Sequence, residues 1–172
     1  VHAPGRWEPG SGRGSERTDM HILVTGGAGY IGSRLVADLI AAGAQLRVFD
    51  RLVYGGESLL PFFANPQFQF IQGDIRDPEA LAAAMRGVDA VVHLAAIVGE
   101  QACAIDEAAA GAINRDAGID ALRLAAEAGV KRFVFLSSQT AYGPSTQGRP
   151  LVEDDPRRPI EFYGQSKLEA EH

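Results

Sequence analysis

A tyrosine and a lysine near the end of the sequence have the spacing of a proton-transfer pair. Tyr163 and Lys167 are four positions apart, so a helix over residues 161–172 would place both on one face with their polar ends close together. A free phenol has a pKa of about 10 and is a poor base near neutral pH. A nearby ammonium would favour the phenolate, and a pKa lowered by about two or three units would make Tyr163 a usable proton acceptor. Such a pair also occurs on ordinary helix surfaces, so it indicates catalysis only in combination with other motifs.

A glycine-rich stretch near the start of the sequence has the spacing of a phosphate-binding turn. Gly26, Gly29 and Gly32 lie between an apolar run typical of a buried strand (21–24) and an amphipathic stretch typical of a helix (31–42). Glycines at this spacing permit a tight turn, close approach of the backbone to a pyrophosphate, and close packing of the helix on the strand. The free N–H groups and the positive dipole end of the helix would then face the phosphates.

The segment after this helix supports a nucleotide site. Residues 45–49 form a second strand-like run that ends at Asp50, where a dinucleotide-binding fold places the acid that binds the ribose. The sequence therefore predicts a dinucleotide cofactor. A glycine turn that only closes a strand–helix unit is the alternative interpretation.

Strand-like and helix-like segments alternate from Met20 onward. The expected strands are 21–24, 45–49, 68–71, 88–94 and 130–136, and the expected helical segments are 31–42, 57–64, 77–85 and 105–128, the last interrupted by Gly111 and Gly118. Repeated β–α units imply an α/β fold, a doubly wound parallel sheet of the Rossmann type with helices on both faces. In such a sheet ligands bind beyond the carboxyl ends of the strands. The glycine turn, Asp50, Asp74, Ala95 to Ala96 and Ser137 to Ser138 should therefore meet in one crevice.

Composition excludes several classes of function. The chain has 172 residues, a hydrophobic share of 46% and a net charge of −6, which suit one globular domain and argue against nucleic acid or an anionic membrane as the main partner. The single cysteine, Cys103, excludes an intrachain disulfide and fits a cytoplasmic location. The apolar run 91–98 is too short to cross a bilayer. We expect no metal site, and we expect His93 to be structural.

Six motifs follow one another in an order that resembles a known family. They are the glycine turn, Asp50, Gly73-Asp74-Ile75-Arg76-Asp77, His93-Leu94-Ala95-Ala96, the run from Phe135 to Gly143, and Tyr163-x-x-x-Lys167. In this order they resemble the extended short-chain dehydrogenase/reductase family, most closely its NAD-dependent epimerase/dehydratase branch, which acts on nucleotide sugars. The resemblance covers residues 20–172 and implies NAD as the cofactor and a nucleotide sugar as the substrate.

The resemblance implies which residues bind the cofactor. They are Gly26, Gly29, Tyr30, Ile31, Gly32, Asp50, Arg51, Asp74, Ile75, Leu94, Ala95, Ala96, Asn114, Ser137, Tyr163 and Lys167. The glycine turn would line the pyrophosphate, and Asp50 would bind the adenosine ribose and so favour NAD over NADP. Arg51 beside it could pair with a 2′-phosphate, which weakens that preference. Asp74 and Ile75 would frame the adenine, and the small residues after the fourth strand would leave room for the nicotinamide half.

The resemblance also implies the chemistry. Ser138 would hydrogen bond the reacting sugar hydroxyl and help Tyr163 to take its proton, while Lys167 would also hold the nicotinamide ribose. The sugar carbon would give hydride to NAD and become a ketosugar. Members that dehydrate sugars typically have an Asp-Glu pair where this sequence has Gln139 and Thr140, so epimerisation is favoured. An NAD(P)-dependent sugar oxidoreductase or ketoreductase, and a non-catalytic NAD-binding sensor or assembly module, are the alternatives.

Two expectations concern the ends of the chain. Residues 1–19 are rich in Gly, Pro, Arg and Ser, and we expect a disordered leader, a remnant of cloning, or translation from upstream of a natural start at Met20. Members of the family usually continue past the Tyr-x-x-x-Lys helix into a region that holds the nucleotide sugar. We therefore expect an NAD-binding domain over 20–172, truncated before that region, which binds NAD but turns over poorly alone. The resemblance also implies a homodimer through segment 105–128 and the helix near residue 161.

Overall fold

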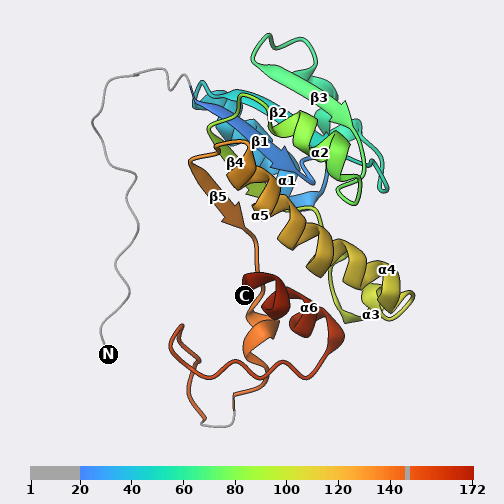
Figure 1. Ribbon diagram of the computed structural model, residues 1–172, viewed down its shortest axis with the longest axis vertical. Coiled ribbons are helices and arrows are strands. Elements are labelled where there is room, and N and C mark those ends of the chain that lie inside the picture. Colours follow the sequence, from blue (N-terminus) through green and yellow to red (C-terminus); the bar gives the residue numbers. More distant parts are fainter. Residues whose placement is uncertain (1–19, 146–147) are drawn as a thin grey trace.

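The sheet is fully parallel. The computed structural model describes residues 20–145 and 148–172, and the expectation for residues 1–19 lies outside them. Within the described residues a five-stranded sheet has the order β3-β2-β1-β4-β5 (Figure 1). The strands are β1 (His21–Thr25), β2 (Gln45–Asp50), β3 (Phe68–Gln72), β4 (Ala90–His93) and β5 (Arg132–Phe135). The predicted Rossmann-type fold is confirmed, although β4 and β5 are shorter than the apolar runs 88–94 and 130–136 suggested.

Helices cover both faces of this sheet. One face packs against α1 (Tyr30–Ala41) and the 3₁₀ segment η1 (Glu57–Phe62), and the other against α2 (Pro78–Met85) and α5 (Ala117–Glu127). Leu23 faces the α2 and α5 side and Val24 the α1 side, and both are fully buried. A central strand that is buried on both faces needs a continuous apolar run, which explains the pattern of residues 21–24.

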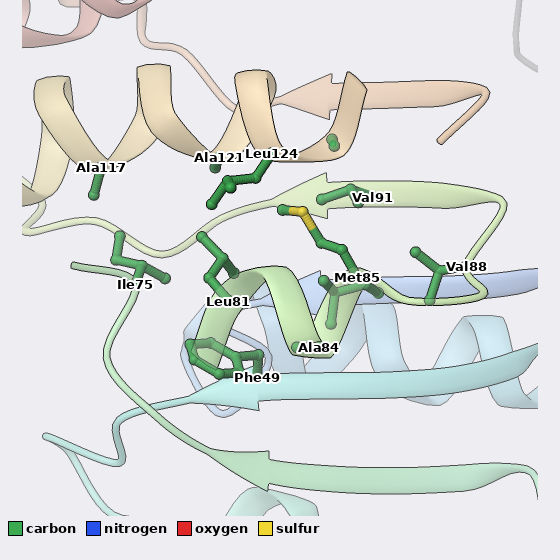
Figure 2. Close-up of a cluster of buried hydrophobic side chains, with 12 residues drawn as sticks. Phe49, Ile75, Leu81, Ala84, Met85, Val88, Val91, Ala117, Ala121 and Leu124 are labelled. Atoms are coloured by element: carbon green, nitrogen blue, oxygen red, sulfur yellow. The ribbon is translucent and has the colours of Figure 1, made fainter. Parts of the chain in front are cut away.

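The larger apolar cluster fixes the position of α2 and α5. Phe49 and Leu81 are fully buried in it, together with Met85 and Val91 (Figure 2). The N-terminus of α2 is set by Asp77, whose Oδ1 accepts hydrogen bonds from the backbone N–H groups of residues 79 and 80, each at 3.1 Å. The helix therefore begins where its local sequence predicts.

The remaining helical segments lie beyond the carboxyl ends of β4 and β5. They are α3 (Glu100–Cys103), α4 (Glu107–Gly111), a π-helical turn η2 (Ala112–Asp116), a 3₁₀ turn η3 (Gln139–Tyr142) and α6 (Phe162–Glu171). The expected interruption at Gly118 is wrong, because this glycine is buried inside α5. Packing of α5 on the sheet stabilises it more than the helix propensity of one residue destabilises it. No helix in the described part of the chain is long and apolar enough to cross a membrane.

His93 is part of the packed interior. Its side chain is 1% exposed, and its Nδ1 lies 3.0 Å from the hydroxyl oxygen of Thr25. Its ring stacks against Phe133 and Phe135, with ring centroids 5.9 Å apart in each pair. Burial, aided by the positive charge of Lys167, lowers the pKa of His93 to about 4. The neutral imidazole is therefore the form that the fold accommodates.

This burial predicts a pH-dependent stability. Because the pKa of His93 is lower in the folded state, the unfolded chain binds the proton more tightly, and the fold loses stability as pH falls from about 6.5 towards 4. A His93→Gln variant lacks this titration. The free energy of unfolding of the wild type should therefore lose up to about 3 kcal/mol of its advantage over the variant between pH 7 and pH 4. Urea unfolding at both pH values measures it, with His21→Gln, at an exposed position, as the control. Parallel stability profiles of the wild type and His93→Gln would contradict the prediction.

Candidate functional site

The segments predicted to meet at one edge of the sheet are joined there by backbone hydrogen bonds. Gly26 N–H donates to the carbonyl of Phe49 at 3.0 Å, and Gly73 N–H donates to that of Asp50 at 3.0 Å. On the other side of β1, Leu94 N–H donates to the carbonyl of Thr25 at 3.1 Å. The chain runs outward from β1 to β3 and then returns to β4 on the opposite side of β1. This reversal is the switch point at which open α/β sheets bind their ligands.

The three glycines of the turn have different surroundings. Gly26 has a φ of +73°, and a Cβ there would lie 2.6 Å from the backbone nitrogen of Ala95. A Cβ on Gly32 would lie 2.2 Å from the carbonyl oxygen of Gly26. A Cβ on Gly29, in contrast, would meet only that same oxygen, at 3.3 Å. Gly26 and Gly32 are therefore required by the fold, whereas Gly29 faces an open side.

The start of α1 presents backbone donors on this open side. Gly29 is the N-cap residue, and among the described residues no side chain caps the first turn. The side chain of Tyr30 is almost fully exposed and that of Ile31 about half exposed, so neither covers the helix end. Uncapped N–H groups at the positive end of a helix dipole suit an anionic ligand such as a pyrophosphate.

Asp50 ties the turn to the end of β2. Its Oδ2 accepts a hydrogen bond from Ala28 N–H at 2.9 Å, and its Oδ1 accepts one from Leu52 N–H at 2.8 Å. Each carboxylate oxygen has a second lone pair, so the side chain can hold the turn and still accept hydrogen bonds from ribose hydroxyls. The sequence predicted the ligand role of Asp50 and missed the structural one.

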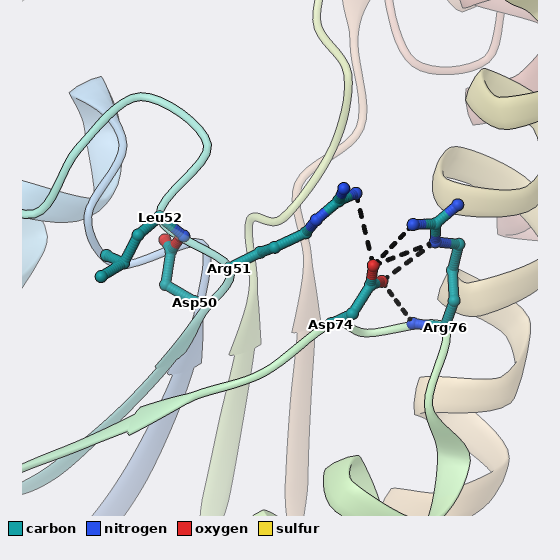
Figure 3. A network of polar contacts seen from close by, with 5 residues as sticks. All are labelled: Asp50, Arg51, Leu52, Asp74 and Arg76. Carbon is teal, nitrogen blue, oxygen red and sulfur yellow. Dashed lines mark hydrogen bonds and ion pairs between the residues drawn. The ribbon is translucent and has the colours of Figure 1, made fainter.

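Asp74, at the end of β3, lies between two arginines (Figure 3). Its carboxylate pairs with Arg76 at 2.6 Å and with Arg51 at 3.3 Å. The pKa of Asp74 is lowered to about 2, and the side-chain hydrogen bonds from Arg76 are the largest cause. Ile75, expected beside the adenine, is buried in the apolar cluster under α2, so its side chain belongs to the core.

Asn114 fixes the loop after β4. This side chain is 1% exposed, its Oδ1 accepts from Ile97 N–H at 2.8 Å, and its Nδ2 donates to the Ile97 carbonyl at 2.9 Å. The loop held in this way contains the partly buried Ala95 and Ala96. The structure places Asn114 in the π-helical turn η2, an irregularity that is frequent at functional sites. Its amide contacts Ile97 and so holds the chain directly after Ala95 and Ala96.

Tyr163 and Lys167 are buried residues of α6, the helix that lies beyond the carboxyl end of β5 (Figure 1). The Lys167 ammonium donates to the carbonyl of Leu136 at 3.0 Å and lies 4.7 Å from the centroid of the Phe135 ring. Burial lowers the pKa of Lys167 to about 8. Burial also raises the pKa of Tyr163 above its usual value, while a hydrogen bond with Ser138 acts in the opposite direction. Within the protein, burial outweighs the Ser138 interaction that favours the phenolate, and the lowering expected from nearby positive charges stays a prediction.

Ser138, and not Ser137, is directed at the tyrosine. The Ser138 hydroxyl oxygen accepts hydrogen bonds from the backbone N–H and the hydroxyl of Thr140, at 3.2 and 2.8 Å. A serine hydroxyl has two acceptor lone pairs and one proton, so its proton remains available for Tyr163. Ser137 donates instead to Glu171. Sequence reasoning missed Thr140 as the residue that orients Ser138, although a Ser-x-Thr turn is a recognisable local pattern.

Glu100 holds the beginning of α6. Its carboxylate Oε2 accepts the backbone N–H of Tyr163 at 3.0 Å, and it satisfies one of the donors that the first turn of a helix leaves unpaired. Glu100 lies in α3, far from Tyr163 in sequence, so no local sequence pattern could predict this contact. In residues 20–145 and 148–172 no three His, Cys, Asp or Glu side chains gather in a way that could hold a metal ion.

Comparison with known proteins identifies one family. The family described as NAD dependent epimerase/dehydratase matches residues 22–172. A UDP-glucose 4-epimerase of Lacticaseibacillus casei is 37% identical over 154 residues, which cover 88% of this chain and 45% of that protein. A 3 beta-hydroxysteroid dehydrogenase/Delta 5-->4-isomerase of Mycobacterium tuberculosis is 36% identical over 159 residues, 87% of this chain and 40% of that protein.

A solved structure shares the fold. The dTDP-glucose 4,6-dehydratase of Streptomyces venezuelae, crystallised with NAD, is 36% identical and superposes with a TM-score of 0.82 over 88% of this chain and 49% of that one. The chain thus spans about half the length of the curated relatives and of the solved structure that it matches.

The surroundings of the glycines predict unequal effects of two similar substitutions on the free energy of unfolding. Gly32→Ala should lower the free energy of unfolding by about 1–3 kcal/mol, because the new methyl group overlaps the backbone of the turn. Gly29→Ala should lower it by less, about 0.5–1 kcal/mol, because glycine is preferred over alanine at an N-cap and the methyl group meets only the Gly26 carbonyl oxygen, at 3.3 Å. Urea unfolding of both variants beside the wild type measures the difference. Equal losses of stability would show that Gly29 is also a packing residue.

Proposed function

This chain belongs to the NAD-dependent epimerase/dehydratase family, and from that premise we propose that it binds NAD and carries the proton-transfer groups of a nucleotide-sugar epimerase. One observation carries the proposal. Tyr163, whose phenolate the Ser138 side chain favours, shares α6 with the buried Lys167, and Lys167 donates to the carbonyl of Leu136 just after β5, at the edge of the sheet that also holds the open glycine turn. A binding site and a proton-transfer set therefore share one edge.

The residues at this edge fit NAD. The open side of Gly29 and the uncapped start of α1 suit a pyrophosphate. Asp50 keeps lone pairs for the ribose hydroxyls of the adenosine half. The partly buried Ala95 and Ala96 leave room beside the turn for the nicotinamide half. The solved dehydratase that matches this fold holds NAD, which supports the same assignment.

The proton-transfer role follows from the contacts of Tyr163. The phenolate form of Tyr163 takes the proton of the reacting sugar hydroxyl and becomes the phenol, while the Ser138 side chain favours the phenolate. Lys167, with its ammonium held by Leu136, places a positive charge on the same helix face. NAD, when bound, supplies the hydride acceptor for the sugar carbon. Because burial alone raises the pKa of Tyr163, the base needs the nearby positive charges and the Ser138 hydrogen bond to act near neutral pH.

Epimerisation is favoured over dehydration by the residues after Ser138. Gln139 and Thr140 cannot perform carboxylate acid–base chemistry, and the Thr140 hydroxyl already donates to Ser138. The likeness to a hydroxysteroid dehydrogenase supports a second candidate, simple oxidation or ketoreduction of a hydroxyl group. The two differ in whether the hydride returns to the same substrate. A non-catalytic NAD-binding module has no need of a converging Ser–Tyr–Lys set, so it ranks third.

The cellular setting and the oligomer are parts of the proposal. We infer a cytoplasmic protein that forms a homodimer through the helical segment 105–128 and α6. Ile119 and Leu122 on α5 support the dimer, because each of these apolar side chains is about half exposed and would be covered by a helix of a second copy.

Cofactor binding is the first test of the proposal. Calorimetric titration should show saturable NAD binding by the wild type, weakened at least about tenfold in Gly29→Ala, whose methyl group fills the side on which the pyrophosphate would lie. Gly111→Ala is the matched control, because its methyl group would lie 3.5 Å from the Phe162 ring, an ordinary contact away from the turn. Equal NAD affinity of Gly29→Ala and the wild type would argue against this turn as the pyrophosphate site.

Chemistry is the second test. Because the chain is expected to turn over poorly alone, the test uses single-turnover mixtures of concentrated chain with NAD and UDP-glucose. The slow formation of reduced nicotinamide and of the C4 epimer should both fall to the level without protein in Tyr163→Phe. NAD affinity should stay close to that of the wild type, because the phenylalanine keeps the packing of the ring. Reduction of NAD without any epimer would favour the oxidoreductase. Undiminished reaction in Tyr163→Phe would exclude Tyr163 as the base.

A further inference from the structure

Arg51 and Asp74 extend from the ends of two neighbouring strands. Asp50 is the last residue of β2, and Gly73 follows β3 with its N–H bonded to the Asp50 carbonyl at 3.0 Å. Arg51 and Asp74 come directly after these residues, and their side chains meet at 3.3 Å (Figure 3). The contact is therefore formed beside the carboxylate that the proposed function assigns to the adenosine ribose.

The chain leaves β2 through an unusual turn directly after Arg51. Leu52 has a φ of +62° and is the only residue other than glycine with a positive φ among those described. This left-handed conformation costs an ordinary residue about 1–2 kcal/mol. It is held here by the hydrogen bond from Leu52 N–H to Asp50 Oδ1 at 2.8 Å. Backbone strain that is maintained by a polar contact is typical of ligand-binding segments, and it fixes how the chain leaves β2.

The two arginines are held by Asp74 to different degrees. Arg76 donates to both carboxylate oxygens through Nε and Nη2, and its backbone N–H donates to Oδ1 at 3.0 Å. Arg51 makes a single ion pair, and its side chain is 53% exposed. Arg76 is therefore held to Asp74 by several contacts, whereas Arg51 is an exposed cation held by one ion pair.

This arrangement bears on the choice between two dinucleotides. NADP differs from NAD by a phosphate on the 2′-oxygen of the adenosine ribose, and folds of this type bind that phosphate with an arginine near the ribose-binding acid. Arg51 is adjacent to Asp50 and could serve in that way, but its guanidinium is already paired with Asp74. The charges of Asp50, Arg51, Asp74 and Arg76 sum to zero, so no net positive charge remains for a phosphate.

We propose that Asp74 is a specificity-determining residue, which excludes 2′-phosphorylated dinucleotides by holding Arg51 in an ion pair beside the ribose site. The inference rests on the proposed function, because it requires the adenosine half of the dinucleotide to lie at this edge. Without the Asp74 charge, Arg51 turns towards the ribose and pairs with a 2′-phosphate, and the site gains a net positive charge.

The test compares NAD and NADP binding by calorimetry. Asp74→Asn keeps an oxygen that can accept the backbone N–H of Arg76, so the turn after β3 is retained. We expect the ratio of the NADP to the NAD dissociation constant to fall by about tenfold in this variant. Both dinucleotides contain the same adenine, so any weakening of an adenine contact cancels in the ratio. Adenosine 2′,5′-bisphosphate compared with AMP repeats the measurement without the nicotinamide half.

Two further variants assign the effect to Arg51. Arg51→Ala alone should leave the ratio close to that of the wild type, and Asp74→Asn combined with Arg51→Ala should lose the tenfold gain. Asp38→Asn is the matched control, because it removes one negative charge and an ion pair of 3.1 Å with Arg34 from the last turn of α1. Its ratio should equal that of the wild type.

The outcomes separate this inference from the proposed function. An unchanged ratio in an Asp74→Asn protein that binds NAD normally would overturn the inference alone. The same would follow if the gain persisted without Arg51, or if Asp38→Asn produced it. Absence of NAD binding by folded wild-type protein would overturn the proposed cofactor site, and the inference with it.

Discussion

The close approach of α1 to the turn after β1 is the constraint on which the site depends. Gly32 leaves no space for a side chain against the Gly26 carbonyl, and Gly26 leaves none against Ala95. One turn is thereby pressed between the helix that follows it and the loop after β4, while Gly26 N–H bonds to the end of β2. Any loosening there would move the helix end and two neighbouring loops together.

Around this turn, side chains from distant parts of the chain act mainly by holding backbone. Asn114 holds the loop after β4, Glu100 holds the start of α6, and Asp50 holds the glycine turn. Each of these polar groups finds its partner in buried or partly buried surroundings, where an unpaired group would be costly. The edge of the sheet is therefore organised before any ligand arrives, which is the condition for tight positioning of a reacting group.

What the sequence could predict was local. The Rossmann-type fold could be predicted from the strand runs, the Asp77 cap and the order of the β–α units, because each of these signals depends only on residues close together in the sequence. The roles of the site residues remain predictions, but their gathering at one edge follows from strand order. Glu100, the ion pair of Arg51 with Asp74, and the second role of Asp50 could not be predicted, because their partners lie 22 to 63 residues away. The burial that raises the pKa of Tyr163 could not be predicted either, because burial depends on the whole fold.

Burial gives the two ends of the site different electrostatic characters. Around Asp50 and Asp74 the charges are partly exposed and paired, so solvent screens them and exchange of one partner for another costs little. Tyr163 and Lys167, in contrast, are buried. Burial lowers the pKa of the lysine and raises the pKa of the tyrosine, so it favours the neutral form of each. A charged pair at that end gains more from each fixed contact, because the interaction is weakly screened. Specificity can thus reside at the exposed end of the site, and proton transfer at the buried end.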